Sequence, residues 1–211
     1  MNNSVANTGR LAWAALRMLL VLTVVTGILY PLAVTGVAQG LFHDKANGSI
    51  VKVEGEEVGS ELIGQTWGLP KKNPEDENEV ARPDPKWFQP RPSNSGYDPL
   101  STGSNQLGAS DPTLTKLVGD TKKAVAAFNG VPESKVPKDA VTGSASAIDP
   151  HISPKYAEIQ IKRVAQANGL TEQQVAKLVE DHTEGRTGGF LGEPHVNVLT
   201  LNLALKDLAA R

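Results

Sequence analysis

The clearest pattern in the chain is a single uncharged run near its beginning. Residues 18–42 carry no formal charge, and residues 18–29 are almost wholly apolar. At a rise of about 1.5 Å per residue, a helix of this length reaches past the roughly 30 Å hydrocarbon core of a bilayer. The pattern predicts a membrane-spanning helix over 18–42, preceded by a short tail (1–17) and followed by a separate domain (43–211).

Two arginines set the expected orientation of this span. Arg10 and Arg17 precede it, whereas the next charged residues after it, Asp44 and Lys45, cancel each other. Because basic flanks favour the cytoplasmic side of a membrane, we expect the tail inside the cell. The domain that follows the span is then extracytoplasmic.

The same segment leaves two alternatives open. Pro31 lacks a backbone N–H, so we expect it to kink the helix unless the helix already ends at Tyr30. A cleaved signal peptide is the alternative to a retained anchor, with the small residues 36–38 as its cleavage site. The anchor is favoured because most of the uncharged run lies beyond the short apolar region that a signal peptide needs.

Beyond the span, the chain mixes short alternating stretches with helix start and stop signals. Asp111, Ser153 and Thr171 are suitable N-caps for three helices. Together the patterns predict strands at 51–57, 62–67 and 196–201, and helices from 112, over 154–168, from 171 to near 185, and over 202–210. Because strands and helices do not alternate regularly, we expect an α+β domain on a single N-terminal transmembrane helix.

One stretch interrupts these patterns. Residues 71–86 contain three prolines and five acidic residues and have little apolar content. This composition is typical of a solvated loop or an insertion. An acidic metal-binding loop is the alternative, but the carboxylates lack the spacing of a calcium loop.

Composition narrows the chemistry. The formal charge of −2 and an aromatic content of 5% argue against nucleic acid as a partner. The absence of cysteine excludes disulfides and thiolate ligands, and the four histidines lack zinc-ligand spacing. Neither a phosphate-binding loop nor a hydrolase nucleophile motif is present. We therefore expect no metal site, no firmly bound cofactor and no catalytic residue.

Residues 144–153 form the densest polar cluster in the sequence. A hydrolase interpretation would make one of its serines the nucleophile, His151 the base and Asp149 the residue that orients it. The favoured interpretation is a turn, in which Asp149 accepts backbone N–H groups and His151 bonds a carbonyl oxygen.

A second polar loop, around residues 100–106, has a faint likeness to the signature loop of ATP-binding cassette proteins. Its small residues and closing glutamine could approach a phosphate through backbone N–H groups. The candidate nucleotide-binding residues are Ser101, Gly103, Ser104 and Gln106. A plain surface loop is the simpler interpretation.

Taken together, several segments resemble one family, the C subunit of the Kdp potassium-transporting P-type ATPases of bacteria and archaea. The matching stretches are 30–31 (Tyr-Pro), 59–65 (Gly-Ser-Glu-Leu-Ile-Gly-Gln), 91–93 (Arg-Pro-Ser), 104–108 (Ser-Asn-Gln-Leu-Gly), 136–142 (Val-Pro-Lys-Asp-Ala-Val-Thr), 149–154 (Asp-Pro-His-Ile-Ser-Pro), 160 with 163–165, 191–199 (Leu-Gly-Glu-Pro-His-Val-Asn-Val-Leu) and 201–202. The motif residues singled out are Gln65, Arg91, Ser93, Asn105, Asp149, His151 and Asn197. The sequence departs from the family pattern at 71–86, 101–103 and 147–148.

The resemblance implies an accessory subunit of an ATP-driven high-affinity potassium importer in a prokaryotic plasma membrane. Its partners would be a potassium-conducting subunit and a P-type subunit that hydrolyses ATP. The family subunit is needed for assembly, and it has been proposed to act as a catalytic chaperone that raises the ATP affinity of the hydrolysing subunit. Any ATP contact of this chain would then be made through that subunit.

The chaperone role conflicts with the expected topology, because ATP is cytoplasmic and the polar loop would lie outside. We give more weight to the topology, and expect the domain to dock over the outer mouth of the potassium-conducting subunit. The span would pack on partner helices through Gly27, Tyr30, Pro31, Gly36 and Gly40. The alternatives are a tethered extracytoplasmic binding module without a pump and an anchored hydrolase.

Overall fold

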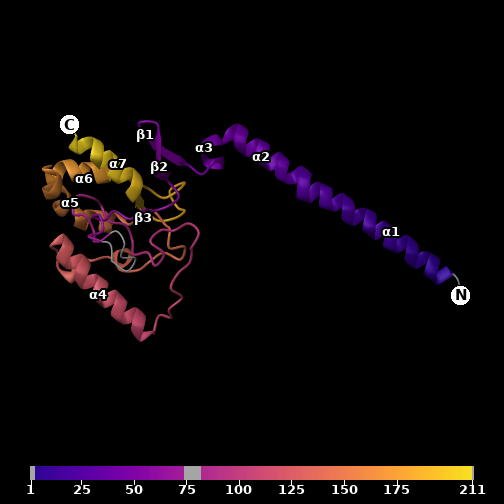
Figure 1. The fold of residues 1–211 in the computed structure, drawn as a ribbon, viewed down its shortest axis with the longest axis horizontal. Helices are drawn as coiled ribbons and strands as arrows, with labels where there is room; N and C mark the ends of the chain where they lie inside the picture. The colour runs from indigo at the N-terminus through magenta and orange to yellow at the C-terminus, as the bar shows by residue number, and fades with distance from the viewer. Residues whose placement is uncertain (1–2, 74–81, 211) are drawn as a thin grey trace. The chain divides into compact units, whose positions relative to one another are not determined.

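The computed structural model describes residues 3–73 and 82–210, which divide into two compact units, Met1–Ile50 and Val51–Arg211 (Figure 1). The first unit is helical. The second is a mixed helix and sheet domain, as the α+β prediction expects.

The first unit is a long apolar helix. It consists of α1 (Asn3–Val24), a π-helical turn η1 (Val25–Leu29) and α2 (Tyr30–Leu41). The stretch Ala6–Leu41 is long and apolar enough to cross a membrane. It contains the predicted span almost entirely, and the helix also includes most of the residues expected to form a tail.

The wide turn η1 accommodates Pro31. A proline ring clashes with the carbonyl four residues before it and leaves that carbonyl without a donor. Here Tyr30 N–H bonds the Val25 carbonyl, five residues back, so the turn is widened just before the proline. The helix continues to Leu41, and the alternative that it ends at Tyr30 is wrong.

A polar corner follows the long helix. Phe42 leaves the helical conformation, and the short α3 (His43–Ala46) begins directly after it. The Gln39 and Asn47 side-chain amides exchange two hydrogen bonds of 3.2 and 3.1 Å, and Asn47 Nδ2 also donates to the His43 carbonyl at 2.7 Å. These bonds join the end of α2 to the end of α3.

The domain begins with a hairpin of β1 (Ile50–Val53) and β2 (Glu56–Ser60). Glu54 and Gly55 have φ angles of 54° and 89°, which reverse the chain in two residues. The single strand predicted over 51–57 is therefore wrong, because its alternating pattern runs across the turn. The strand predicted at 62–67 is also wrong, since this stretch folds as turns and irregular chain.

The chain just before the 71–86 stretch is tied to the described part near the end of that stretch. Leu69 N–H donates to the Arg82 carbonyl at 2.8 Å, and Asp84 N–H donates to the Trp67 carbonyl at 3.1 Å. Gly68 and Pro83 form an antiparallel bridge between them. Residues 74–81, which hold most of the acidic residues of the predicted insertion, lie outside the described residues.

Three helices begin at the N-caps expected from the sequence. Their bounds are α4 (Pro112–Asn129), α5 (Pro154–Asn168) and α6 (Glu172–Asp181). Asp111 and Ser153 each accept an N–H bond at the start of their helix, and Thr171 forms the full capping box with Gln174. The last helix ends before the predicted 185, and a short strand follows it.

That strand, β4 (Thr183–Glu184), belongs to a three-stranded antiparallel sheet in the order β3-β5-β4. The other strands are β3 (His151–Ile152) and β5 (His195–Asn197), and α7 (Val198–Ala209) follows directly. The strand predicted over 196–201 is thus wrong after its second residue. Asn197 accepts bonds from Leu199 N–H and Thr200 N–H, and this cap starts a helix inside a β-prone run.

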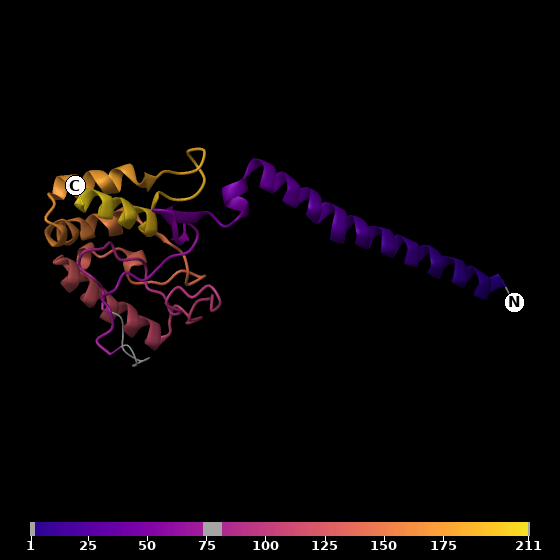
Figure 2. The ribbon, with the colours of Figure 1, turned by 45° about the horizontal axis from the view of Figure 1, so that its top comes forward.

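The core lies among α5, α6, α7 and the sheet. Helix α6 packs against both α5 and α7, and α4 contacts α5 from another side (Figure 2). Two short 3-10 turns, η2 (Glu133–Lys135) and η3 (Lys138–Ala140), connect α4 toward the sheet. The fully buried apolar side chains include Phe88, Ile152, Val164, Val175, Val196, Leu201 and Leu205.

Candidate functional site

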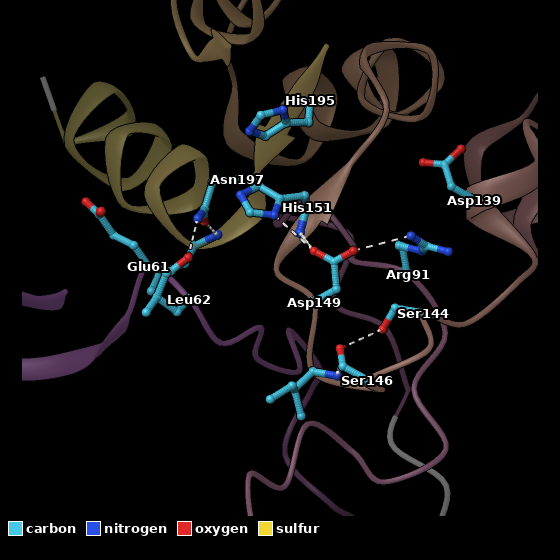
Figure 3. A network of polar contacts seen from close by, with 12 residues as sticks. Glu61, Leu62, Arg91, Asp139, Ser144, Ser146, Asp149, His151, His195 and Asn197 are labelled. Carbon is cyan, nitrogen blue, oxygen red and sulfur yellow. Dashed lines mark hydrogen bonds and ion pairs between the residues drawn. The ribbon is translucent and has the colours of Figure 1, made fainter. Parts of the chain in front are cut away.

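A half-buried polar cluster gathers residues that are far apart in the sequence. Asp149, just before β3, accepts a hydrogen bond from its neighbour His151 N–H at 3.0 Å through Oδ1. Its other oxygen, Oδ2, lies 3.3 Å from Arg91 Nη1 (Figure 3). The Asx-turn predicted for Asp149 is confirmed, and the ion pair to Arg91 is an addition that the local sequence does not show.

Arg91 joins three segments of the chain. Besides Asp149, its guanidinium donates to the Thr142 carbonyl at 3.3 Å through Nε and to the Gly143 carbonyl at 3.0 Å through Nη2. A planar guanidinium has a fixed fork of donors, so these three bonds fix the side chain in one orientation. The cluster therefore links the chain at Arg91 to residues 142–143 and to Asp149, and it also forms a polar surface.

These contacts keep Asp149 ionised. Burial, the largest single influence, raises the pKa of this carboxyl group. The hydrogen bonds from His151 and the positive charge of Arg91 together outweigh burial, and the pKa of Asp149 is lowered from its usual value. Near neutral pH the cluster therefore holds a carboxylate whose two oxygens are both engaged.

The His151 ring contacts this carboxylate, with Nδ1 3.0 Å from Asp149 Oδ1, instead of the carbonyl oxygen predicted from the sequence. The ring also meets His195 edge to face, with ring centroids 4.5 Å apart. His195 in turn lies 3.6 Å from a Glu184 carboxylate oxygen and 3.0 Å from the Glu193 carbonyl. Two imidazoles and two carboxylates thus lie side by side where β3 and β5 pair.

A shallow depression of about 480 Å³ opens over the cluster, lined by residues that include Leu62, Arg91, Ser144 and His151. The nearby serine hydroxyls are engaged elsewhere. Ser144 Oγ lies 3.3 Å from Ser146 Oγ, and Ser153 Oγ donates to Asp139 at 2.9 Å. A serine nucleophile needs a histidine base within hydrogen-bond reach, and the hydroxyl contacts described here go to other groups. In the described residues, no three His, Asp or Glu side chains group to hold a metal ion.

Three of the remaining motif residues donate hydrogen bonds to backbone carbonyls outside their own turns. Gln65 donates to the Val58 carbonyl at 2.7 Å, and Ser93 donates to the Ala147 carbonyl at 2.7 Å. Asn197 donates to the Glu61 carbonyl at 2.8 Å while it caps α7. Each of these side chains holds the fold together, whereas Asn105 lies exposed in its loop.

The candidate nucleotide loop uses several of its own N–H groups. Ser101 N–H donates to Asp98 O at 3.1 Å, and Gly103 N–H donates to Ser146 O at 2.9 Å. Gln106 N–H lies 3.3 Å from Ser104 Oγ. A phosphate cradle requires converging free N–H groups, and these three are already bonded inside the domain.

In the helical unit, the candidate membrane contacts are open to a partner. A Cβ added at Gly27, Gly36 or Gly40 would meet nothing within 4 Å. Tyr30 is exposed beside Pro31. Small residues on an open helix surface allow another helix to approach closely.

A second polar cluster is buried, and its role was not evident from the sequence. Gln160 and Arg163 on α5 and Asn202 on α7 hold the chain 85–89, a turn at 85–86 followed by irregular chain. Asn202 exchanges two hydrogen bonds with the backbone of Phe88, at 2.9 and 3.0 Å, and Gln160 does the same with Gln89, at 2.7 and 3.0 Å. The side-chain amides thus pair this chain as a neighbouring strand would.

Arg163 completes this buried cluster. It donates to the carbonyls of Pro85 and Trp87, to Gln160 Oε1 and to Asn129 Oδ1, at 2.6 to 3.0 Å. Its guanidinium also lies 4.4 Å from the centre of the Phe128 ring. Burial lowers the pKa of Arg163 to about 10, which leaves it charged at neutral pH.

Comparison with known proteins places this architecture in a family. A model of the family described as K+-transporting ATPase, c chain, matches residues 12–207. The chain is 53% identical to the potassium-transporting ATPase KdpC subunit of Streptomyces avermitilis, over all of this chain and 99% of that one. The chain belongs to the KdpC family. The resemblance predicted from the ordered motifs is thereby confirmed.

Further relatives in the family show the same full-length match. The KdpC subunit of Kineococcus radiotolerans is 46% identical, over 99% of this chain and all of its own. That of Mycobacterium tuberculosis is 46% identical, over 92% of this chain and 96% of its own. A c chain is one subunit of a larger assembly, so membership identifies an accessory subunit of a potassium-transport complex.

Proposed function

We propose that this chain is an extracytoplasmic accessory subunit of an ATP-driven potassium importer, needed for its assembly and stability. The long helix anchors it in a prokaryotic plasma membrane and packs on partner helices. The domain docks over the outer mouth of the potassium-conducting subunit. The observation that carries this proposal is the extent of the family match, which runs through both the helix and the domain.

The domain's chemistry supports a non-catalytic role. In the polar cluster, Asp149 is paired with Arg91 and His151, and the serine hydroxyls beside them are bonded to other groups. The sequence lacks the Asp-Lys-Thr-Gly-Thr motif, so the chain cannot form the aspartyl phosphate of a P-type pump itself. ATP hydrolysis and potassium conduction are then the work of two partner subunits.

Charge supports the proposed topology. Arg10 and Arg17 precede the apolar stretch, and the first charges after α2, Asp44 and Lys45, cancel. The basic flank favours a cytoplasmic N-terminus and a domain outside the cytoplasm.

A role in ATP binding, which the family resemblance implies, ranks second. The proposed topology separates the loop at 101–106 from cytoplasmic ATP. Its bonded N–H groups at Ser101, Gly103 and Gln106 also leave fewer donors for a phosphate. On this proposal, any effect on ATP affinity passes through the hydrolysing subunit and requires no nucleotide on this chain.

Thiol labelling in intact cells tests the topology, and the absence of cysteine makes each introduced label unique on this chain. A membrane-impermeant maleimide should label Ser101→Cys without permeabilisation. The matched control, Asn7→Cys in the tail, should react only after the membrane is opened. The reverse pattern would overturn the extracytoplasmic domain and restore the case for a direct ATP role.

Co-purification tests the assignment to a pump. A tag on the full chain should bring two larger membrane proteins with it, in a complex whose ATPase activity responds to potassium. A chain that purifies alone from cells expressing its neighbouring genes would favour the tethered binding module. Hydrolysis by the isolated chain that Asp149→Ala abolishes would favour the anchored hydrolase.

A further inference from the structure

The loop at 185–194, between β4 and β5, exposes two large apolar side chains at its tip. Phe190 is 73% exposed and Leu191 is 57% exposed. They are adjacent in the chain, whereas the other large exposed apolar residues of the described domain (Leu62, Leu100 and Leu117) are separated in sequence. Large contiguous apolar patches mark interaction sites, and this pair is the one place in the described domain where two large exposed apolar side chains are adjacent in the chain.

The tip is braced from within. Thr187 and Leu191 pair as an antiparallel bridge, with N–H to O distances of 2.9 and 3.1 Å. Gly188 and Gly189 have φ angles of 62° and 85°, in the left-handed region that glycine adopts at little cost. At the base of the loop, Arg186 Nη2 lies 2.8 Å from Glu193 Oε2. The apolar tip is therefore presented in one shape before any partner binds, which lowers the entropy cost of binding.

The loop rises beside the polar cluster. Its two ends pair as Glu184 and His195, and the His195 ring packs on His151. Both ribbon views show the loop at the end of the domain where the chain enters at Val51, together with the irregular segment that precedes α4 (Figures 1 and 2).

The charges around the tip favour a protein partner over lipid. Segments that bind a bilayer surface combine apolar residues with basic ones that attract anionic headgroups. Here Arg186 is the only lysine or arginine between β4 and β5, and it is engaged by Glu193, while Glu184 adds negative charge. An apolar centre with a paired polar rim is the arrangement found at protein–protein contacts.

We infer that Phe190 and Leu191 form a docking tip that inserts into an apolar pocket on the outward-facing surface of the potassium-conducting subunit. This inference rests on the proposed function, because it requires the pump as partner. The proposed function says only that the domain docks on the pump, and this inference names the residues that make the contact. The aromatic ring is the anchor, and the Arg186–Glu193 pair braces the base of the loop that carries it.

Photocrosslinking in the assembled complex tests the tip directly. A photoreactive phenylalanine analogue at position 190 of the full chain should crosslink to the potassium-conducting subunit, identified by mass. The same analogue at Leu117 on α4, which is 49% exposed, should give at most a tenth of that product. Crosslinks to the ATP-hydrolysing subunit, to lipid alone, or only within this chain would overturn the inference.

A charged substitution tests whether the contact matters. Phe190→Asp should reduce the yield of co-purified partner subunits at least tenfold, and Leu117→Asp should leave it within twofold of wild type. The unfolding midpoint of each purified variant checks that the domain still folds. Full assembly with Phe190→Asp would overturn the docking tip alone, whereas failure of the wild-type chain to bring down any pump subunit would refute the proposed function itself.

Discussion

Arg163 and Arg91 lie in the same domain and bond similar carbonyl groups, but their surroundings differ. Arg163 is buried, and the partners described for it are carbonyl and amide oxygens and an aromatic ring. Arg91 is half-buried, and one of its partners is the Asp149 carboxylate. A buried cation without bonding partners is very costly, so the Arg163 site depends on the four hydrogen bonds that its guanidinium donates.

The buried cluster around Arg163 therefore supports the fold, whereas the half-buried cluster around Arg91 forms part of the domain's surface. The buried cluster with Gln160 and Asn202 holds the chain 85–89 against α5 and α7, and solvent cannot replace its bonds when one is lost. The cluster with Asp149 and His151 faces an open depression, where water can take over part of any lost contact. Substitutions should therefore cost more stability at the first cluster than at the second.

The largest effect is expected for Arg163→Leu. The substitution removes the printed donor of Asn129 Oδ1 and of the Pro85 carbonyl, whereas Gln160 Oε1 and the Trp87 carbonyl keep N–H groups of Gln89. We expect a cost of about 4 kcal/mol in the free energy of unfolding. Urea unfolding of the full chain in detergent, followed by near-UV circular dichroism, measures this. The neighbouring exposed Lys162→Ala is the control and should change stability by less than about 0.5 kcal/mol. Equal losses in both variants would contradict the scaffold role.

Asn202→Leu should have the next largest effect. Leucine is similar in size, but it leaves both Phe88 N–H and Phe88 C=O without a partner in the core. We expect a loss of about 2 kcal/mol. The same urea titration measures it, with Asp207→Ala on the exposed side of α7 as the control. A stability loss smaller than that of Asp149→Asn would contradict the expectation that substitutions cost more in the buried cluster than in the half-buried one.

Asp149→Asn should cost about 1 kcal/mol at neutral pH, because the half-exposed amide keeps some hydrogen bonds but loses the charge. The lowered pKa of Asp149 also gives the wild-type chain a pH dependence. A carboxyl group whose pKa is lower in the folded state adds stability that is complete at neutral pH. That stability is lost as the pH falls below the unfolded pKa of about 4 and through the folded one.

The pH dependence of the urea midpoint tests this prediction, and an exposed carboxyl group on α4 provides the control. Urea midpoints from pH 7 to pH 3 should fall less steeply for Asp149→Asn than for wild type. The exposed Asp120→Asn on α4 should follow the wild-type curve. An Asp149→Asn curve parallel to wild type would show that the carboxylate is not stabilised by folding.

The smallest effect on stability is expected for Phe190→Ala. The side chain is mostly exposed and buries little area in its own domain, so the free energy of unfolding of the isolated chain should change by less than about 0.5 kcal/mol. The same substitution should weaken the assembled complex. A clear loss of stability in the isolated chain would mean that the tip packs on its own domain and is not free to dock.

The sequence predicts well what depends on neighbouring residues. The N-caps Asp111, Ser153 and Thr171 and the Asx-turn at Asp149 each involve bonds over two or three positions, and all four are found. The family resemblance rests on motifs that follow a fixed order along the chain. The family model that matches residues 12–207 confirms it.

Long-range contacts are where the sequence falls short. Gln160 and Asn202 bond backbone groups 71 and 114 positions away, and a polar residue on a helix carries no local sign of such a partner. The predicted start of the last helix, at 202, is wrong for a related reason, since α7 begins at Val198. The cap at Asn197 is fixed by its own bond to the Glu61 carbonyl, which overrides the β-propensity of Val198 and Leu199.

The backbone bonds between 67–69 and 82–84 have a consequence for how this family can vary. Because they close the base of the segment between them, the entropy cost of lengthening that segment grows only slowly. A reporter peptide inserted after position 76 should therefore leave the domain intact, and relatives can differ in length there at little cost.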